Sequence, residues 1–174
     1  GTQDNGLVYY NPAGKNWFYL LGDGGGVAYD PFDENVMYAT LGLLGWPHTF
    51  GNLRKIGPSA AGWQETPTGL DPSGQWWRLV VTDYNNPPVL YTQTDNKVYY
   101  SENRGDTWTR FATNENPLEI IQSMKVSHGE FPKIYSSGWG PENATCMMLD
   151  AAIWEWTNIT AGLPSKTTDG IYSI

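Results

Sequence analysis

The sequence predicts an all-β protein built from several small antiparallel sheets. Aromatic residues make up 14% of the 174 residues and include 9 Trp, whereas charged residues make up only 16%. Gly and Pro contribute 20 and 12 residues, which is enough to interrupt the chain often. Aromatic side chains favour a pleated, half-buried surface, and Gly and Pro favour tight turns. This composition therefore indicates short strands joined by many turns.

Three segments repeat one short pattern, in which a Tyr follows an Asp or a Ser at a constant distance. The intervals are 38 − 30 = 8, 91 − 83 = 8 and 135 − 127 = 8 residues. The residues between these positions, at 31–35, 84–88 and 128–132, are rich in the turn formers Pro, Asn and Gly. Each segment is therefore interpreted as a strand, a tight turn and a second strand.

A Trp follows each of four units at a nearly constant spacing. The intervals are 63 − 17 = 46, 108 − 63 = 45 and 156 − 108 = 48 residues. A repeat of this length, with four strands in each period, is typical of a β-propeller blade, which buries both of its faces against its neighbours. A β-sandwich is the alternative, but its strands are not expected to repeat one register three times. The predicted blades are 1–21 (partial), 22–70, 71–116, 117–164 and, as the first strand of a further or closing blade, 165–174.

The segment 101–108 reads Ser-Glu-Asn-Arg-Gly-Asp-Thr-Trp and resembles the Asp-box (BNR repeat), S-x-D-x-G-x-T-W, of a large class of β-propellers. The resemblance implies a hairpin between the third and fourth strands of a blade, with a structural role. Side chains of the first and third box positions tie the turn, Gly gives backbone freedom, and Trp fills the core between blades. The residues at these positions are Ser101, Asn103 (in place of Asp), Gly105, Thr107 and Trp108.

The segments 1–6 and 22–26 are similar to the larger Asp-box propellers, which include sortilin-type receptors and xyloglucanase-type glycoside hydrolases. By alignment with the repeat, residue 1 falls in the second strand of a blade and residues 169–174 in a first strand. We expect about four antiparallel four-stranded blades, either as a four-bladed ring or as a segment of a six- to eight-bladed propeller. Related propellers are usually larger, and a fragment on its own would expose unpaired strand edges. A segment of a larger propeller is therefore favoured over a four-bladed ring.

Two carboxyl groups are candidates for catalysis. In the xyloglucanase-type enzymes an Asp before a Gly-rich turn acts as a general acid or base, and Asp23 matches that pattern, with Asp4 a weaker match. Glycoside hydrolysis needs two carboxyl groups on either side of the sugar. The two acids of the family come from separate propeller halves, whereas Asp4 and Asp23 lie in consecutive blades. A structural role at turns is therefore favoured for both.

Binding is the better-supported function. Residues 41–51 form an insertion relative to the other units, and Gly and Pro bound its aromatic side chains. Exposed aromatic rings stack on sugars or anchor protein partners. We expect an extracellular binding or structural module that recognises a glycan or a protein; the alternatives are a glycoside hydrolase and a self-associating subunit of a surface assembly. The candidate ligand-binding residues are Trp46, His48, Phe50, Trp76, Trp77 and Trp139.

Other functions have little support in the sequence. The net charge of −8, the pI near 4.5 and the scattered basic residues argue against nucleic acid, and no apolar run is long enough to span a bilayer. The single Cys146 and the isolated His48 and His128 predict neither a metal site nor a disulfide, and no cofactor is expected. In a eukaryotic secreted protein, the sequons at Asn143 and Asn158 would accept glycans.

Overall fold

The computed structural model describes residues 7–11, 14–20, 23–42, 52–56, 63–65, 68–70, 80–83, 89–94, 97–111, 118, 120–128, 131–139, 146–150, 152–153 and 155–161. The regular elements of these residues are antiparallel β-strands, which form one hairpin and three four-stranded sheets. The all-β prediction is therefore confirmed. None of the described residues belongs to a helix that is long and apolar enough to cross a membrane.

The strands pair in the order in which they follow along the chain. The N-terminal hairpin contains β1 (Leu7–Asn11) and β2 (Asn16–Leu20). The first sheet contains β3 (Asp23–Asp30), β4 (Asp33–Gly42), β5 (Asn52–Ile56) and β6 (Trp63–Glu65). The central sheet contains β7 (Val80–Asp83), β8 (Val89–Thr94), β9 (Lys97–Ser101) and β10 (Thr109–Arg110). The third sheet contains β11 (Ile120–Val126), β12 (Lys133–Trp139), β13 (Cys146–Asp150) and β14 (Glu155–Asn158).

The Tyr repeat of the sequence marks the pairing of the first two strands in each sheet. Tyr38 lies opposite Ala28, Tyr91 opposite Val81 and Tyr135 opposite Lys125, so each Tyr pairs with the residue ten positions before it. The two predicted strands of each segment are therefore confirmed in all three sheets, while the turn predicted at 84–88 lies outside the described residues.

The Trp repeat marks a second shared register, between the third and fourth strands. Three of these Trp residues lie opposite the residue seven positions earlier, in the pairs Tyr10–Trp17, Ile56–Trp63 and Leu149–Trp156. In the central sheet, Thr109 pairs with Tyr100, so that Trp108 stands beside Ser101 in the same register. By this register, the N-terminal hairpin corresponds to the last two strands of a sheet.

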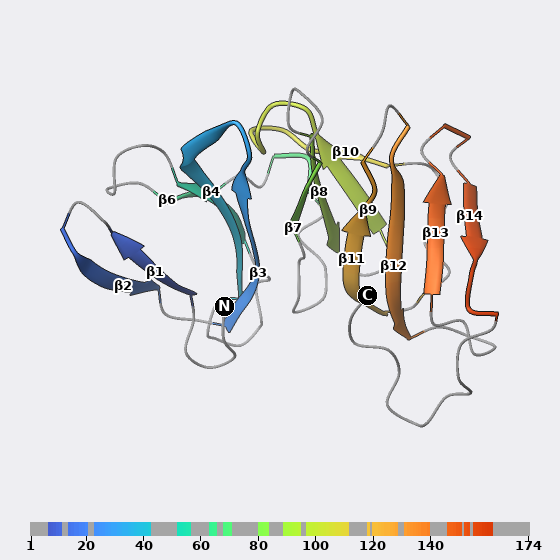
Figure 1. The fold of residues 1–174 in the computed structure, drawn as a ribbon, viewed down its shortest axis with the longest axis horizontal. Coiled ribbons are helices and arrows are strands. Elements are labelled where there is room, and N and C mark those ends of the chain that lie inside the picture. The colour runs from blue at the N-terminus through green and yellow to red at the C-terminus, as the bar shows by residue number, and fades with distance from the viewer. Residues whose placement is uncertain are drawn as a thin grey trace.

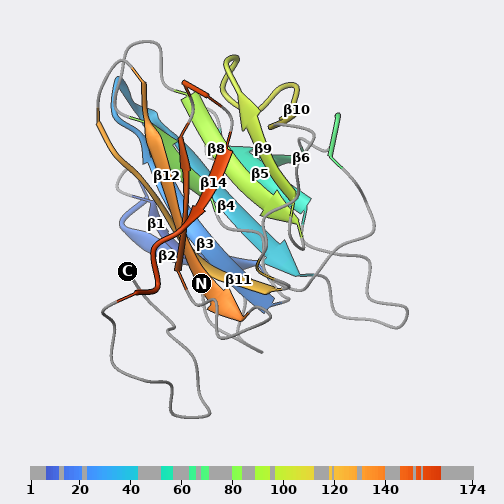
Figure 2. The ribbon, with the colours of Figure 1, turned by 90° about the vertical axis from the view of Figure 1, so that its right-hand side faces the viewer.

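The sheets stand in a row, in chain order, from the N-terminal hairpin to the third sheet (Figure 1). Figure 2 looks along the row and shows the sheets one behind another, with their faces turned toward their neighbours. The first strands of successive sheets are adjacent, since β3 contacts β7 and β7 contacts β11. In each sheet, the first and third strands end and the second and fourth strands begin at one end, which we call the upper end. The lower end is where the first strand begins and the second strand ends.

Two apolar clusters join the three sheets. The first joins the first and central sheets and contains Val36, Tyr38, Leu70, Leu90, Tyr99 and Trp108. The second joins the central and third sheets and contains Tyr91, Val98, Phe111, Leu118, Met124, Ile134, Met147 and Leu149. Successive side chains of a strand point to opposite faces, so neighbouring residues of β8 and β9 supply both clusters. The central sheet consequently buries both faces. Each large apolar side chain that is fully buried stabilises the fold by roughly 1.5–3 kcal/mol.

The repeated Trp does not always fill a junction between sheets. Trp108 is 4% exposed, and Trp156 packs against the cluster between the central and third sheets. Trp17, in contrast, is 69% exposed and lies beside Tyr10, with the ring centroids 5.1 Å apart. The N-terminal hairpin stands at one end of the row of described sheets, so one of its faces has no described sheet against it (Figure 1). The division into blades and the closure of a ring stay predictions.

Candidate functional site

The hairpin that resembles an Asp-box is tied from within by Ser101. Its Oγ accepts hydrogen bonds from the backbone N–H of Gly105 at 2.9 Å and of Asn103 at 3.4 Å. The same hydroxyl donates to Asn103 Oδ1 at 2.9 Å. Since Ser101 is only 2% exposed, these bonds replace water for polar groups at the base of the turn.

Asn103 closes the other side of the turn. Its Oδ1 accepts from the Thr107 N–H at 2.9 Å, and its Nδ2 donates to Thr107 Oγ1 at 2.8 Å. An amide supplies both an acceptor and a donor, so Asn fits a position at which the Asp-box usually has Asp. With Asp at this position, the Thr107 hydroxyl would have to donate the bond that it now accepts.

The backbone of the turn passes through two consecutive residues of left-handed conformation. Arg104 has φ 59° and Gly105 has φ 87°. Gly adopts this conformation readily, whereas a side chain makes it unfavourable by roughly 1–2 kcal/mol. The hydrogen bonds of Ser101 and Asn103 therefore hold Arg104 in a conformation that it would not adopt alone.

The end of the turn is also hydrogen-bonded to the segment that follows the first sheet. The Trp108 N–H donates to the Thr68 carbonyl oxygen at 2.9 Å. The next residue, Gly69, has φ 89°, and a Cβ atom there would collide with the Trp108 carbonyl. A close approach of two backbones thus requires glycine at this position.

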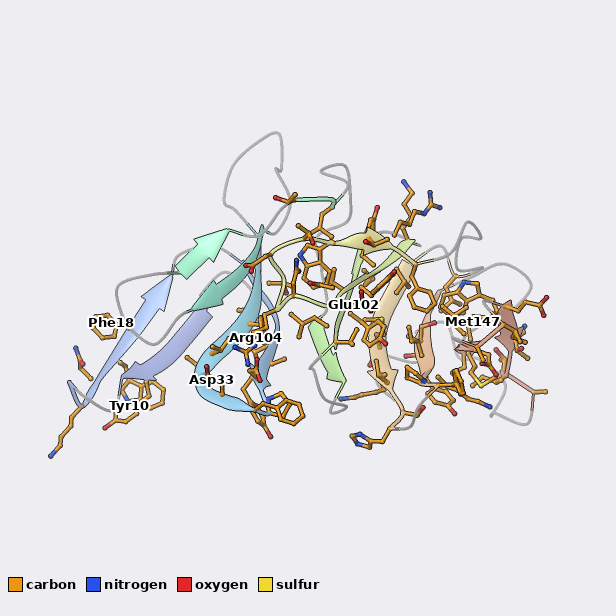
Figure 3. All side chains as sticks on the ribbon, turned by 90° about the horizontal axis from the view of Figure 1, so that it is seen from above. Tyr10, Phe18, Asp33, Glu102, Arg104 and Met147 are labelled. Carbon is orange, nitrogen blue, oxygen red and sulfur yellow. The ribbon has the colours of Figure 1, made fainter. Side chains whose placement is uncertain are left out.

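Arg104 joins this turn to the turn between β3 and β4. Its Nε lies 3.0 Å from Asp30 Oδ2, and one terminal nitrogen lies 3.9 Å from Asp33 Oδ2. Figure 3 shows Arg104 and Asp33 close together between the two sheets. The Asp30 side chain is 0% exposed, so its charge is compensated by protein groups rather than by water.

Two further donors complete the surroundings of Asp30. The Phe32 N–H donates to Oδ1 at 2.9 Å, and the Tyr38 hydroxyl donates to Oδ2 at 3.1 Å. Burial raises the pKa of Tyr38 above its ordinary value, and the nearby Asp30 carboxylate raises it further. Asp30 is consequently a structural carboxylate, enclosed and paired with a cation. Sequence reasoning used Asp30 only as a repeat marker and placed Arg104 only in the hairpin; their opposite charges were the signal for this pair.

The candidate acid Asp23 lies at the lower end of the first sheet. It is the first residue of β3 and pairs with Gly42, the last residue of β4. The segment 43–51, which contains Trp46, His48 and Phe50, lies outside the described residues. It connects β4 to β5, whose first residue Asn52 pairs with Leu41, so both of its ends lie at this same end of the sheet. Asp4 lies outside the described residues as well.

Among the other aromatic candidates, Trp139 belongs to the lower end of its sheet. Trp139 is the last residue of β12 and pairs with Ile120, the first residue of β11. Trp76 and Trp77 lie outside the described residues, shortly before β7 begins at Val80. In Figure 1, β3 and β11 run in one direction and β4 and β12 in the other. The register therefore places Asp23 and Trp139 at the lower ends of their sheets, whereas the Asp30–Arg104 pair lies at the upper end.

The remaining candidates occupy separate places. Asn158 is exposed at the end of β14, and its Oδ1 accepts from the Thr160 N–H at 2.9 Å; Asn143 lies outside the described residues. Cys146, the single cysteine, is buried, and His128 is exposed in the loop before β12. Within the part of the chain that the structure describes, no group of His, Cys, Asp and Glu side chains could hold a metal ion.

Similarity to known proteins is found among solved structures. No family model matches the sequence. No curated protein matches it either. Among solved structures, the GH74 enzyme of Niastella koreensis is similar, with a TM-score of 0.44 and 15% sequence identity over 90% of this chain and 34% of that chain. The chain therefore spans about a third of the length of that enzyme.

Proposed function

We propose that this chain is a run of β-propeller blades that acts as an extracellular binding or structural module. The proposal is supported by the three sheets with common registers, joined face to face by apolar clusters. A blade needs neighbours on both faces, and the central sheet has this property. Propellers of this kind serve many functions, so the function has to be argued from the loops.

The placement of the candidate residues at the lower end carries the binding proposal. At the upper end, Ser101, Asn103, Arg104 and Asp30 are engaged with one another and hold the turns together. At the lower end, Asp23 begins β3 and Trp139 ends β12, and the strands β4 and β5, which the segment 43–51 connects, end and begin there. Aromatic rings at strand ends stack on sugars or anchor a protein segment. The proposed partner is therefore a glycan or an extracellular protein, bound at the lower end.

Binding is tested with the whole chain on a glycan array and in a pull-down from extracellular fluid, with Trp46→Ala as the variant. The matched control is Phe131→Ala, which removes an aromatic ring that is 63% exposed in the loop between β11 and β12, at the upper end. The proposal expects Trp46→Ala to lose binding at least ~10-fold and Phe131→Ala to retain it. Equal binding by both variants, or no partner for the unaltered chain, would refute it.

A second candidate function is glycoside hydrolysis with Asp23 as one of two acids. The observation that favours it is the position of Asp23, which starts β3 at the end of the sheet where β4 ends and β5 begins. The reaction needs a second carboxyl group across the sugar, for which Asp4 is the weaker candidate. Turnover of β-glucan oligosaccharides that is lost in Asp23→Asn would support this function. Turnover that persists in the variant would remove Asp23 from it.

A further inference from the structure

One face of the N-terminal hairpin is apolar and exposed. Val8 and Tyr10 alternate along β1 and so share this face, and Trp17 lies opposite Tyr10 on β2. Their exposed fractions are 50% for Val8, 44% for Tyr10 and 69% for Trp17. We call these three residues the hairpin face.

The shared register identifies what this face corresponds to in the other sheets. The residue seven positions before the repeated Trp is Tyr10 in the hairpin, Ser101 in the central sheet and Leu149 in the third sheet. The residue two positions before each of these is Val8 in the hairpin, Tyr99 in the central sheet and Met147 in the third sheet. In the central and third sheets these positions are between 0% and 4% exposed.

In both of those sheets, the corresponding face packs against the sheet before it. Tyr99 and Trp108 belong to the cluster that contains Val36 and Tyr38 of the first sheet. Met147 and Leu149 belong to the cluster that contains residues of the central sheet. The hairpin face is the copy of this surface at the end of the described row, and no described sheet lies against it.

The third sheet carries the opposite half of the same junction. On the face of the central sheet that packs against the third sheet, Tyr91 and Phe111 belong to the shared apolar cluster, and Tyr100 packs against that cluster. The corresponding residues of the third sheet are Tyr135, Met148 and Ile159, which we call the third-sheet face. Tyr135 pairs with Met148 as Tyr91 pairs with Tyr100.

A backbone hydrogen bond supports this correspondence. The Ile159 N–H donates to the Cys146 carbonyl at 3.0 Å, as the Phe111 N–H donates to the Val98 carbonyl at 2.7 Å. Ile159 is 37% exposed, and Tyr135 and Met148 are partly exposed. The two ends of the described row therefore carry the two halves of one junction.

We propose that the hairpin face of one chain packs on the third-sheet face of a second copy. This contact continues between copies the junction that already joins the sheets within the chain. It is heterologous, because two different surfaces meet, so it closes into a ring or extends into a longer assembly. It is separate from ligand binding at the lower end, and its test does not depend on that function.

The test is the molar mass of the whole chain, measured by light scattering and sedimentation over micromolar concentrations. The unaltered chain is expected to associate reversibly. Trp17→Glu and Tyr135→Glu are each expected to weaken association by more than ~30-fold, as loss of an interface hot spot does. Val8→Lys and Ile159→Glu are second variants for the two faces, and Phe131→Glu, at a residue 63% exposed outside both faces, is the matched control.

Mixing separates this arrangement from others. Trp17→Glu keeps the third-sheet face and Tyr135→Glu keeps the hairpin face, so the two variants together should form a two-chain complex that neither forms alone. This result would also show that both variants are folded. A monomeric unaltered chain would overturn the proposal. So would loss of association in the Trp17 variant only, or equal loss in the Phe131 control.

Discussion

The ion pair between Arg104 and Asp30 offers the sharpest test of how neighbouring sheets are held together. The two groups come from different sheets, and their side chains meet at 3.0 Å. A double-mutant cycle with Arg104→Met, Asp30→Asn and the double variant isolates their interaction from other effects. Met keeps much of the apolar stem of Arg, and Asn keeps the shape of Asp, so each change removes mainly charge.

The size of the interaction follows from the distance and the exposure of the pair. At 3.0 Å, Coulomb's law gives about 1–6 kcal/mol for effective dielectric constants between those of water and of a protein surface. The Arg104 side chain is 40% exposed, so solvent screening moves the value toward the lower limit. We therefore expect a coupling energy of about 1–2 kcal/mol, with Arg104→Met alone costing ~2 kcal/mol because Asp30 stays buried.

The measurement is urea unfolding of the four proteins, followed by Trp fluorescence, at low salt and at ~1 M NaCl, where screening should reduce the coupling. The control cycle uses Lys133 and Asp150, which are 3.9 Å apart within the third sheet, with Lys133 45% exposed. That exposed pair should couple by less than ~0.5 kcal/mol. A coupling between Arg104 and Asp30 that is no larger than this control would refute the assigned role.

Three further predictions concern the same upper end. Ser101→Ala leaves a buried backbone N–H of the turn without its acceptor and should cost about 1–3 kcal/mol in urea unfolding, whereas Thr107→Ala, at an exposed site, should cost less than ~1 kcal/mol. Gly69→Ala places a Cβ against the Trp108 carbonyl at positive φ and should lower Tm by about 5 °C; an unchanged Tm would contradict this geometry. Because the pKa of Tyr38 is raised, the folded chain keeps a phenol proton that the unfolded chain loses near pH 10. The contribution of Tyr38 to the free energy of unfolding is therefore complete below about pH 10 and falls as the pH rises above it. Tyr38→Phe should flatten that alkaline decline in urea midpoints, and an unchanged slope would contradict it.

The repeated strands could be predicted from the sequence because their signals are local. The spacing from Asp30 to Tyr38 fixes a turn of constant length, and the same spacing recurs in the central and third sheets. The spacing of the Trp residues gave the length of the repeat, and each Trp stands in the same register of its hairpin. Local spacing is sufficient here because antiparallel neighbours are joined by short turns.

The contacts between sheets were harder to predict. The pair of Arg104 and Asp30 joins residues that are far apart in the sequence, and neither the repeat that contains Asp30 nor the box that contains Arg104 predicts a contact between them. The exposure of Trp17 could not be read from its spacing either, because burial depends on whether another sheet lies against that face. The aromatic candidates of the segment 43–51 have no partner in the repeat, since an insertion has no register to align.

Three of the hairpins show why the box motif is found almost complete only once, although the strand pairing repeats. In the central sheet, Ser101 and Asn103 tie the turn. In the third sheet, the Asp150 carboxylate accepts from the Ala152 N–H at 2.9 Å at the corresponding turn, with no Ser or Asn at the box positions. The N-terminal hairpin instead turns through Lys15 at φ 51°. Several local hydrogen-bond patterns can thus close one hairpin register, whereas a Trp stands at the same position of that register in each of these hairpins. The Trp position therefore identifies the repeat where the turn residues do not, and the exposure of Trp17 shows that burial of this Trp depends on a sheet lying against that face.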